Sequence, residues 1–252
     1  MTRYKLSALA VLVFFALISP ITADEMPWDE LAPGLDLARF EDEGLTVLRI
    51  DPGRWETVAL AVSDVGGAPR SARQWGQDHD LQAVINAGMY AKDHLTHTGY
   101  FHIGDHLNNG IWNQKDYKQA ACFGPRQPGL PLFALHDLDT VPESTFTPHY
   151  DVVIQNLRLI KHAGDNRWSP GTRRWSEACL GEDSQGRMLW IHCRKPRTMH
   201  DLNEVLLDLP IDLVAAQHLE GGVQAQLWVD PDLAELDLGG WPVPNVLGIR
   251  PR

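Results

Sequence analysis

Residues 213–222 read Leu-Val-Ala-Ala-Gln-His-Leu-Glu-Gly-Gly. The apolar residues 213–216 predict a short buried strand, which runs into His218 and Glu220. Because side chains two apart in a strand point to one side, we expect the imidazole and the carboxylate to face the same way. The two glycines that follow let a substrate or another backbone approach closely. Such a pair can perform acid–base or anomeric-centre chemistry, although a Gly-Gly turn after a strand is also common without a function.

The residues before this strand predict a hairpin and a helix. Two apolar stretches, 175–181 and 187–192, flank a short polar loop with a glycine near its end, as in a β-hairpin. Thr198 and Asp201 match a capping box, and Pro210 prevents the helix that starts there from continuing. The apolar face of that helix carries Leu202, Val205, Leu206 and Leu209.

Strand signals also occur at 45–50, 56–62, 81–85, 151–155, 158–160 and 225–229. Residues 92–119 are polar and rich in His and Asn, which indicates a long loop interrupted by short strands. No Pro/Ser-rich linker divides the chain. We therefore predict a mixed α/β (α+β) fold, with one domain, 44–252, that has a mixed β-sheet core, few helices and long polar loops. The acidic segment 24–43 is expected to be a surface lead-in.

The composition limits the classes of protein that fit this chain. Its 252 residues are 44% hydrophobic and 22% charged, which excludes collagen-like, coiled-coil and wholly disordered proteins. Its 22 Lys and Arg against 33 Asp and Glu give a formal charge of −11 without a basic cluster, so we expect no nucleic-acid partner. The sequence has no P-loop, dinucleotide-binding fingerprint or Gly-x-Ser-x-Gly elbow, and we expect no cofactor.

The N-terminus has the pattern of an export signal. Arg3 and Lys5 give a positive start, and the apolar run 6–18 is followed by a cleavage site at Ala23. The run is shorter than the roughly 20 residues that a membrane-spanning helix needs. We therefore interpret residues 1–23 as a signal peptide and expect a periplasmic or secreted protein, with no stable membrane insertion after its removal. A retained N-terminal anchor is the alternative.

The cysteines leave two interpretations open. Cys122, Cys179 and Cys193 are odd in number, so at least one thiol stays unpaired within a monomer. An oxidising compartment permits one disulfide, and Cys179 and Cys193 are closest in sequence, on either side of the predicted hairpin. The alternative is three buried thiols that act as small hydrophobic side chains.

Further polar residues lie where predicted strands end or begin. Asn86 ends a strand, and Gly88 lets the backbone turn so that the Asn86 amide either faces a cleft or forms a plain Asx turn. Arg174 and Glu177 are three apart, so they can share a site only if Arg174 lies in the loop before the strand. If a single sheet contains all these strands, their ends lie together along one edge of that sheet. We therefore expect Asn86 and Glu220 at adjacent strand ends, sharing a pocket with Arg174 or Glu177.

Four histidines gather in the polar stretch: His94, His97, His102 and His106. The spacing of His94 and His97 could supply two ligands to zinc or copper, so a periplasmic metal-binding protein is one hypothesis. The helical context of a strong metal motif is missing and no Cys joins the group, so we assign no metal site. We prefer contact of His97 with a substrate, or simple exposure of these side chains in the loop.

Taken in order along the chain, these segments resemble the phosphodiester glycosidase family. The matching segments are Asn86-Ala-Gly-Met-Tyr90, Gln155-Asn156, Arg174-Trp-Ser-Glu-Ala-Cys-Leu-Gly181, Leu219-Glu-Gly-Gly222 and the closing Trp241-Pro-Val-Pro-Asn-Val-Leu-Gly248. The resemblance extends from Ile85 to the C-terminus, and its specificity lies in the order of short motifs. The last family motif shows departures: Glu220 replaces an Asp, and Val223 and Gln224 replace a Gly and a Ser.

The resemblance implies a hydrolase that cleaves a sugar-1-phosphodiester bond in an envelope or extracellular glycan, with a carbohydrate or sugar phosphodiester as its partner. Glu220 would stabilise or attack the anomeric carbon, Arg174 would hold the phosphate, and Glu177 and His218 would complete the catalytic set. We assign to substrate binding Asn86, Gly88, His97, Gln155, Asn156, Gly221 and Gly222. The alternative is a catalytically silent periplasmic glycan-binding protein with the same fold, because an added methylene at a catalytic carboxylate costs rate unless the site has adapted.

The mature protein should begin at Asp24. Cleavage after Ala23 removes the apolar run together with Arg3 and Lys5, which leaves a chain with a formal charge of −11 − 2 = −13. N-terminal sequencing of the exported protein measures this directly. A chain that still begins at Met1 after export would refute the signal peptide and support the retained anchor.

Overall fold

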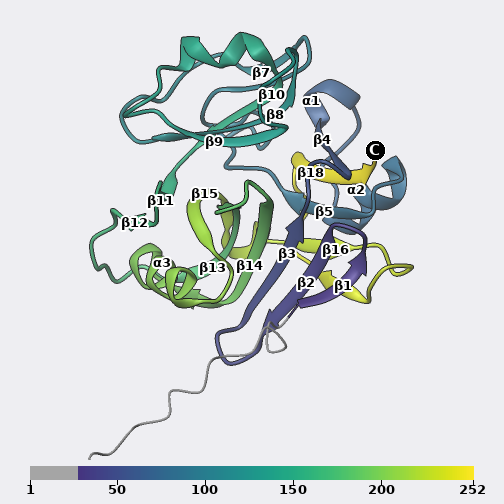
Figure 1. Cartoon of the computed structure of the whole chain (residues 1–252). Helices are drawn as coiled ribbons and strands as arrows, with labels where there is room; N and C mark the ends of the chain where they lie inside the picture. The colour runs from purple at the N-terminus through teal and green to yellow at the C-terminus, as the bar shows by residue number, and fades with distance from the viewer. Residues whose placement is uncertain (1–27) are drawn as a thin grey trace, which may run out of the picture.

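Strands are the main secondary structure of the protein, a computed structural model that describes residues 28–252. The predicted signal peptide lies outside the described residues. The strands form three antiparallel sheets around a shared interior (Figure 1). The first sheet contains, in spatial order, β1 (Trp28–Ala32), β2 (Leu35–Phe40), β3 (Leu45–Ile50), β14 (Met188–Arg197), β13 (Trp175–Asp183), β15 (Leu213–Gly221), β11 (Arg158–Lys161) and β12 (Asp165–Asn166).

The second and third sheets have five strands each. The second contains β7 (His106–Asn109), β6 (Phe101–Ile103), β10 (Tyr150–Asn156), β8 (Gln119–Pro125) and β9 (Phe133–Asp137). The third contains β17 (Leu236–Leu238), β16 (Leu227–Val229), β5 (Ala83–Asn86), β18 (Asn245–Pro251) and β4 (Trp55–Ala61). The α-helices are α1 (Val62–Val65), α2 (Ala72–His79) and α3 (Met199–Asp208), and the 3₁₀ turns are η2 (Glu143–Thr145), η3 (Thr147–His149) and η4 (Gly222–Gln224). In this part of the chain no helix combines the length and apolarity needed to cross a membrane.

Local sequence patterns explain many of these elements. The strand predicted at 45–50 is β3, and the predicted hairpin is β13 and β14. The helix α3 begins at its predicted cap, where the Thr198 hydroxyl accepts a hydrogen bond from the Asp201 amide at 3.0 Å, and it ends before Pro210. The predicted fold class is therefore confirmed: a mixed α and β domain with a sheet core and few helices.

Other features differ from the sequence prediction. The expected surface lead-in instead forms β1 and β2, because Leu35 and Leu37 lie on one face of a strand and pack into the core. The strands that end in Asn86 and Gly221 do not share a sheet, since β5 lies in the third sheet and β15 in the first. Helix α2 was not predicted, although Ser71 and the Gln74 side chain form a complete capping box at its start.

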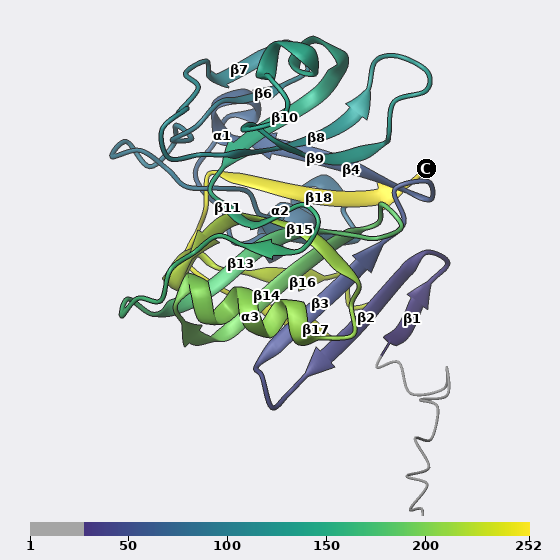
Figure 2. The same ribbon diagram turned by 60° about the vertical axis from the view of Figure 1, so that its left-hand side comes forward.

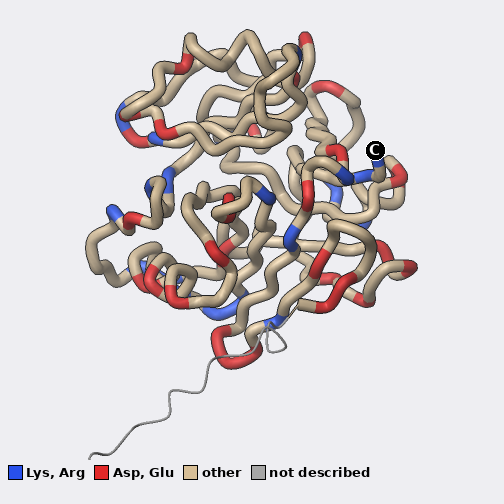
Figure 3. The backbone as a smooth tube through the Cα atoms, viewed as in Figure 1, with Lys and Arg blue, Asp and Glu red and all other residues tan. Residues whose placement is uncertain are grey.

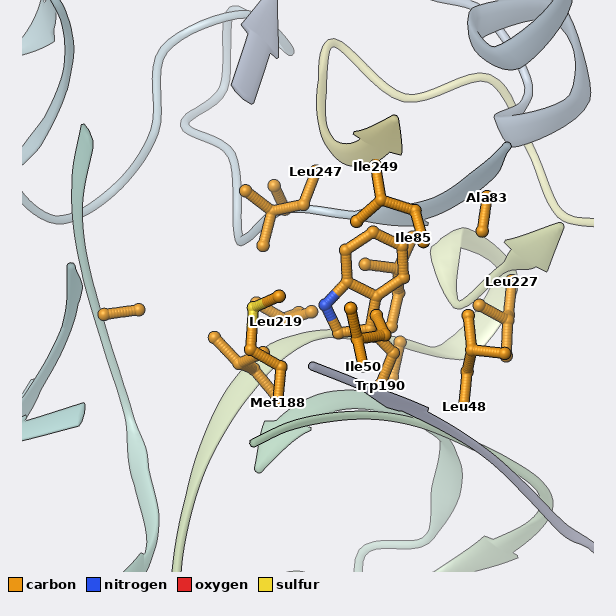
Figure 4. Close-up of a cluster of buried hydrophobic side chains, with 14 of the residues drawn as sticks. Leu48, Ile50, Ala83, Ile85, Met188, Trp190, Leu219, Leu227, Leu247 and Ile249 are labelled. Carbon is orange, nitrogen blue, oxygen red and sulfur yellow. The ribbon is translucent and has the colours of Figure 1, made fainter. Parts of the chain in front are cut away.

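Large apolar side chains from all three sheets fill the shared interior. Trp190 of β14 is fully buried, and Figure 4 shows it surrounded by Ile50, Ile85 and Ile249 from the first and third sheets. Phe101 of the second sheet joins the same cluster. The other face of the first sheet is covered by α3 (Figure 2). Removal of this much apolar surface from water is the main stabilising contribution to the fold.

The structure agrees with three free thiols rather than with a disulfide. Cys122, Cys179 and Cys193 are all buried and unpaired. Cys179 stands opposite Ile191 and Cys193 stands opposite Glu177, so the two thiols of the hairpin are offset along the strands and do not face each other.

Replacing Gly76 with alanine should destabilise the protein, although alanine favours helices. Gly76 lies in α2, and a Cβ there would stand 2.1 Å from Cζ3 of the Trp228 indole. The indole is buried and cannot withdraw, so we expect a loss of about 1–3 kcal/mol in the free energy of unfolding. Thermal denaturation measures it against Gln77→Ala, at an exposed position of the same helix. An unchanged melting temperature in Gly76→Ala would contradict this packing.

Candidate functional site

The end of β15 carries the imidazole and carboxylate that the sequence singled out. Opposite β13, Ala178 pairs with Glu220 and Cys179 pairs with His218, so Leu219 is the extra residue of a β-bulge. Leu219 is buried in the shared core, while His218 and Glu220 line the same cavity. The two polar side chains therefore face one space, as the alternation along the strand predicts.

The cavity has a volume of about 370 Å³, within the size range of small-molecule sites. Its apolar and aromatic walls are formed by Met89, Leu157, Trp168, Trp175 and Met199. The other lining residues are His218, Glu220, Gly221 and Gly222. Leu157 connects β10 to β11, and its carbonyl accepts the backbone N–H of His218 at 2.9 Å. The cavity therefore lies where the chain passes from the second sheet to the first.

A buried ion pair supports the cavity wall. The Glu177 carboxylate on β13 contacts Nδ1 of His218 on the neighbouring β15, and both side chains are almost fully buried. The second carboxylate oxygen accepts a hydrogen bond from the Trp175 indole N–H at 2.9 Å. Burial alone would lower the pKa of His218, but the charge and hydrogen bond of Glu177, together with the charge of Glu220, raise it. The protonated ring is therefore favoured over its ordinary state, and Nε2 is the nitrogen available to a ligand.

Glu220 is the carboxylate that reaches the cavity. Its Oε1 accepts the backbone N–H of Gly221 at 2.9 Å. Burial raises the pKa of Glu220, and Glu177 adds to the rise, while His218 and the Gly221 amide oppose it. A carboxylate with a raised pKa beside an imidazolium, in a cavity with apolar walls, is suited to proton transfer or to attack at an electrophilic carbon.

Four of the residues predicted to bind substrate support the cavity wall and are not among its lining residues. The Asn156 side chain donates to the Leu219 carbonyl at 3.1 Å and so holds the bulge. Nε2 of His97 contacts the Gln155 carbonyl at 2.7 Å, and burial lowers the pKa of His97 to about 4. Gly88 has a φ of +108°, and a Cβ there would stand 2.4 Å from Cε1 of the His97 ring. Glycine is required at this position for both reasons.

Asn86 and Arg174 also lie outside the cavity lining. Asn86 is fully buried and accepts the backbone N–H of Gln226 at 2.9 Å. The prediction that Asn86 and Glu220 occupy adjacent strand ends of one sheet is wrong, because their strands belong to different sheets. Arg174 lies in the loop directly before β13, as a shared site requires. Its guanidinium is more than half exposed, however, and pairs with Asp201 of α3 at 3.2 Å.

The four histidines of the polar stretch do not converge on one point. His97 and His102 each contact a backbone carbonyl of β10, whereas His106 contacts the Ser63 hydroxyl of α1 at 2.9 Å. Within residues 28–252, no three His, Cys, Asp or Glu side chains are arranged to hold a metal ion. The structure therefore does not support the metal-binding hypothesis for this loop.

Three aromatic residues near the cavity were not among the predicted site residues, although Trp175 and Tyr90 lie within the segments that match the family. Trp175 could have been found, because it stands two residues before Glu177 in the same strand and so points to the same side. Neither Tyr90 nor Tyr117 stands at such a spacing from a predicted site residue in a strand. Burial, together with the charge of Glu220, raises the pKa of both tyrosines, so they keep their protons and present neutral hydroxyls near the carboxylate.

The electrostatics of the cavity differ from those of the surface. Lys and Arg are interspersed with Asp and Glu along the described chain (Figure 3). None of the cavity's lining residues is Lys or Arg, so His218 provides the positive charge at its wall. The arrangement can hold a neutral ring against aromatic walls and place an anionic group beside the imidazolium.

Comparisons with known proteins identify the same family as the sequence motifs. The family model for phosphodiester glycosidases matches residues 79–250. The auto-inhibited catalytic domain of zebrafish N-acetylglucosamine-1-phosphodiester alpha-N-acetylglucosaminidase is similar in fold, with a TM-score of 0.61 and 12% identity over 86% of this chain and 78% of that chain. A hypothetical protein from Synechocystis has a TM-score of 0.62 and 12% identity, over 91% of this chain and 65% of its own. Among curated protein sequences, none matches this chain.

Replacing Glu177 with glutamine should lower the pKa of His218. The neutral amide removes the charge of Glu177, which, together with its hydrogen bond and the charge of Glu220, offsets the effect of burial, so the buried ring loses its proton at lower pH. NMR titration of the histidine ring measures this, with Glu204→Gln at an exposed position of α3 as the control. The raised pKa of His218 stabilises the native fold below the ordinary imidazole pKa, and this stabilisation is lost as the pH rises through the folded-state pKa. Equal His218 pKa values in the wild type and the Glu177 variant would contradict the coupling.

Proposed function

Because the chain belongs to the phosphodiester glycosidase family, we propose that it is a glycosidase-type hydrolase that cleaves a sugar-1-phosphodiester bond. The observation that carries this proposal is the coupling of Glu177, His218 and Glu220 at the wall of one cavity. The faces of a pyranose ring carry C–H groups, which pack well against apolar and aromatic walls. A cavity of about 370 Å³ has room for such a ring.

The proposed reaction breaks the bond between the anomeric carbon and the bridging oxygen of the phosphate. The phosphate leaves as an anion with the bonding electrons, so it depends less on a proton donor than an alcohol would. Glu220 stabilises the positive charge that develops at the anomeric carbon, or attacks it, and water supplies the oxygen of the released sugar. His218, kept protonated by Glu177, places positive charge where the phosphate departs.

We assign Arg174 to the phosphate at the mouth of the cavity. It directly precedes Trp175, whose side chain lies in the cavity wall. Its pair with Asp201 is largely exposed, and exposed pairs contribute little stability. The guanidinium can therefore exchange the Asp201 carboxylate for a phosphate, with which it forms bidentate charge-assisted hydrogen bonds.

Gly221 and Gly222 are the substrate-binding residues that face the sugar directly, since both line the cavity. A Cβ on Gly221 would stand 2.5 Å from Cδ1 of Trp175, so a larger residue would displace the cavity wall. The remaining predicted binding residues act indirectly by holding the wall: Asn86, Gly88, His97, Gln155 and Asn156. We therefore expect substitutions at these five positions to displace Glu220 rather than to remove a direct contact with the substrate.

The natural substrate in this proposal is an envelope or extracellular glycan. Access to it depends on export through the signal peptide predicted at residues 1–23, which gives a periplasmic or secreted protein. The second candidate function is glycan binding without cleavage in the same compartment. The longer side chain of Glu220, at a position where the family has Asp, favours that candidate.

The variant Glu220→Gln should stop release of sugar from a synthetic sugar-1-phosphodiester while the fold persists. The substitution keeps the size of the side chain and removes its charge, so we expect kcat/KM to fall by about 10²–10⁴-fold. A melting curve should stay close to that of the wild type. The matched control is Glu235→Gln, at an exposed position outside the cavity lining. Unchanged turnover in Glu220→Gln would remove this residue from the reaction.

The pH profile of kcat/KM provides a second measurement on the same proteins. With increasing pH, kcat/KM should rise as Glu220 ionises and fall as His218 loses its proton. Both changes should occur at a higher pH than is usual for these side chains, because both pKa values are raised. Tight binding of the phosphodiester by the wild type, without any release of sugar, would contradict hydrolysis and support the glycan-binding candidate.

A further inference from the structure

The second sheet has a face that the shared core does not use. Its inner face carries Phe101 and Ile154 of the shared core, whereas its outer face carries a separate buried cluster that contains Val153. Tyr100 and Trp112 pack against this outer cluster, and both side chains remain partly exposed. Figure 2 shows β6, β7 and β10 of this sheet at the opposite end of the molecule from α3. The outer face therefore presents aromatic side chains that the candidate site does not contain.

The rings of Tyr100 and Trp112 stack on each other, with their centroids 4.4 Å apart and an angle of 7° between their planes. We call this pair the Tyr100–Trp112 stack. Tyr100 lines a cavity of about 300 Å³, and Trp112 lines a different cavity of about 220 Å³, so the stack stands between the two. No residue that lines either cavity also lines the cavity of the candidate site. Volumes at or below the lower end of the range for small-molecule sites suit single sugar rings.

The main chain behind the stack is fixed by Gln155 of β10. Its side-chain carbonyl accepts the backbone N–H of Tyr100 at 3.1 Å and that of Asn113 at 2.9 Å. Its amide group donates to the Asn113 carbonyl at 3.0 Å. Gln155 therefore joins the two segments that carry the stacked rings. Because the stack is held in place before any ligand arrives, binding costs little conformational freedom.

Polar side chains in the larger cavity are held in fixed orientations. Nε2 of His102 contacts the Tyr150 carbonyl at 3.1 Å, and a carbonyl only accepts, so Nε2 carries the proton. Nδ1 of His102 then accepts the Tyr100 hydroxyl proton across 3.1 Å. Burial lowers the pKa of His102, which keeps this ring neutral near pH 7. Arg126, in the same cavity, is fixed by a hydrogen bond of 2.8 Å from its Nε to Asp151, and its remaining N–H groups can donate to a ligand.

The charges that line each cavity balance. The larger cavity is lined by Asp105 and Arg126, and the smaller cavity by Lys118 and Glu143. In the smaller cavity, the Gln114 amide also donates to Glu143 at 3.0 Å. A neutral sugar matches this chemistry, because its hydroxyls need both donors and acceptors and its C–H face packs on an aromatic ring. A polyanion would gain little from a site without net charge, and a lipid chain would need a longer continuous apolar surface.

We propose that the outer face of the second sheet carries a second glycan-binding site. In this site the Tyr100–Trp112 stack holds a neutral oligosaccharide, with a sugar unit in each adjoining cavity. The site goes beyond the proposed function, since it needs neither a phosphate nor Glu220. It holds a glycan chain at a surface separate from the proposed reaction centre.

Calorimetric titration with neutral oligosaccharides tests this proposal. The probes are two linear tetramers of glucose, one with β-1,4 and one with α-1,4 linkages. We expect at least one tetramer to bind, with a Kd about 10-fold higher in Trp112→Ala, because the variant loses the aromatic face. Asp105→Ala, at an exposed residue of the larger cavity, should raise the Kd about 3- to 10-fold. The matched control is Lys115→Ala, an exposed residue of the loop that carries Trp112, which lines neither cavity.

Failure of the wild type to bind either tetramer, or equal binding by the wild type and Trp112→Ala, would overturn the proposal. So would tighter binding of a tetramer of α-1,4-linked galacturonic acid than of either neutral tetramer, since the site would then select an anion. Melting curves show whether the variants fold. If Trp112→Ala does not fold, Asp105→Ala decides alone: weaker binding supports the site, and equal binding overturns it. These probes contain no phosphodiester, so their result is independent of whether the protein is a hydrolase.

Discussion

The hydrogen-bonded ion pair between Glu177 and His218 is the interaction on which the candidate site depends. Both side chains are almost fully buried, and a buried charge is tolerated only with its partner, so β13 and β15 must keep their register. The pair fixes one nitrogen of the imidazole, keeps the ring protonated and orients Trp175 through the second carboxylate oxygen. Glu220 shares the cavity with the imidazolium because it stands two residues after His218 on β15.

The arrangement of the three sheets places the Glu177–His218 pair at the wall of the cavity. The chain passes from the second sheet to the first at Leu157, whose carbonyl binds the His218 backbone, and Asn156 holds the bulge from the same crossing. Met89 stands three residues after the end of β5, a strand of the third sheet, and it lines the same cavity. Because the sheets share one core around Trp190, the packing that stabilises the fold also fixes the walls of the cavity.

Elements whose partners lie close in sequence can be predicted from local patterns. The β13–β14 hairpin, the helix that begins after Thr198 and the side of β15 that carries His218 and Glu220 all follow from capping and alternation. The division into three sheets cannot be predicted in this way, because β5 pairs with β16 and β18, which are far from it in the chain. Asn86 illustrates the consequence for the site: its side chain binds Gln226, 140 positions away, in the interior of the protein. From the sequence alone, an amide that ends a strand and binds a distant backbone group cannot be distinguished from one that faces a cleft.

A crystal structure of Glu220→Gln with an intact sugar-1-phosphodiester tests most directly whether this cluster is the reaction centre. We predict that the sugar occupies the cavity against Trp175, with its anomeric carbon about 3–3.5 Å from the side chain at position 220. The phosphate should face Nε2 of His218. A sugar bound outside the cavity, or a phosphate directed away from His218, would contradict the assignment of Glu177, His218 and Glu220 to the reaction.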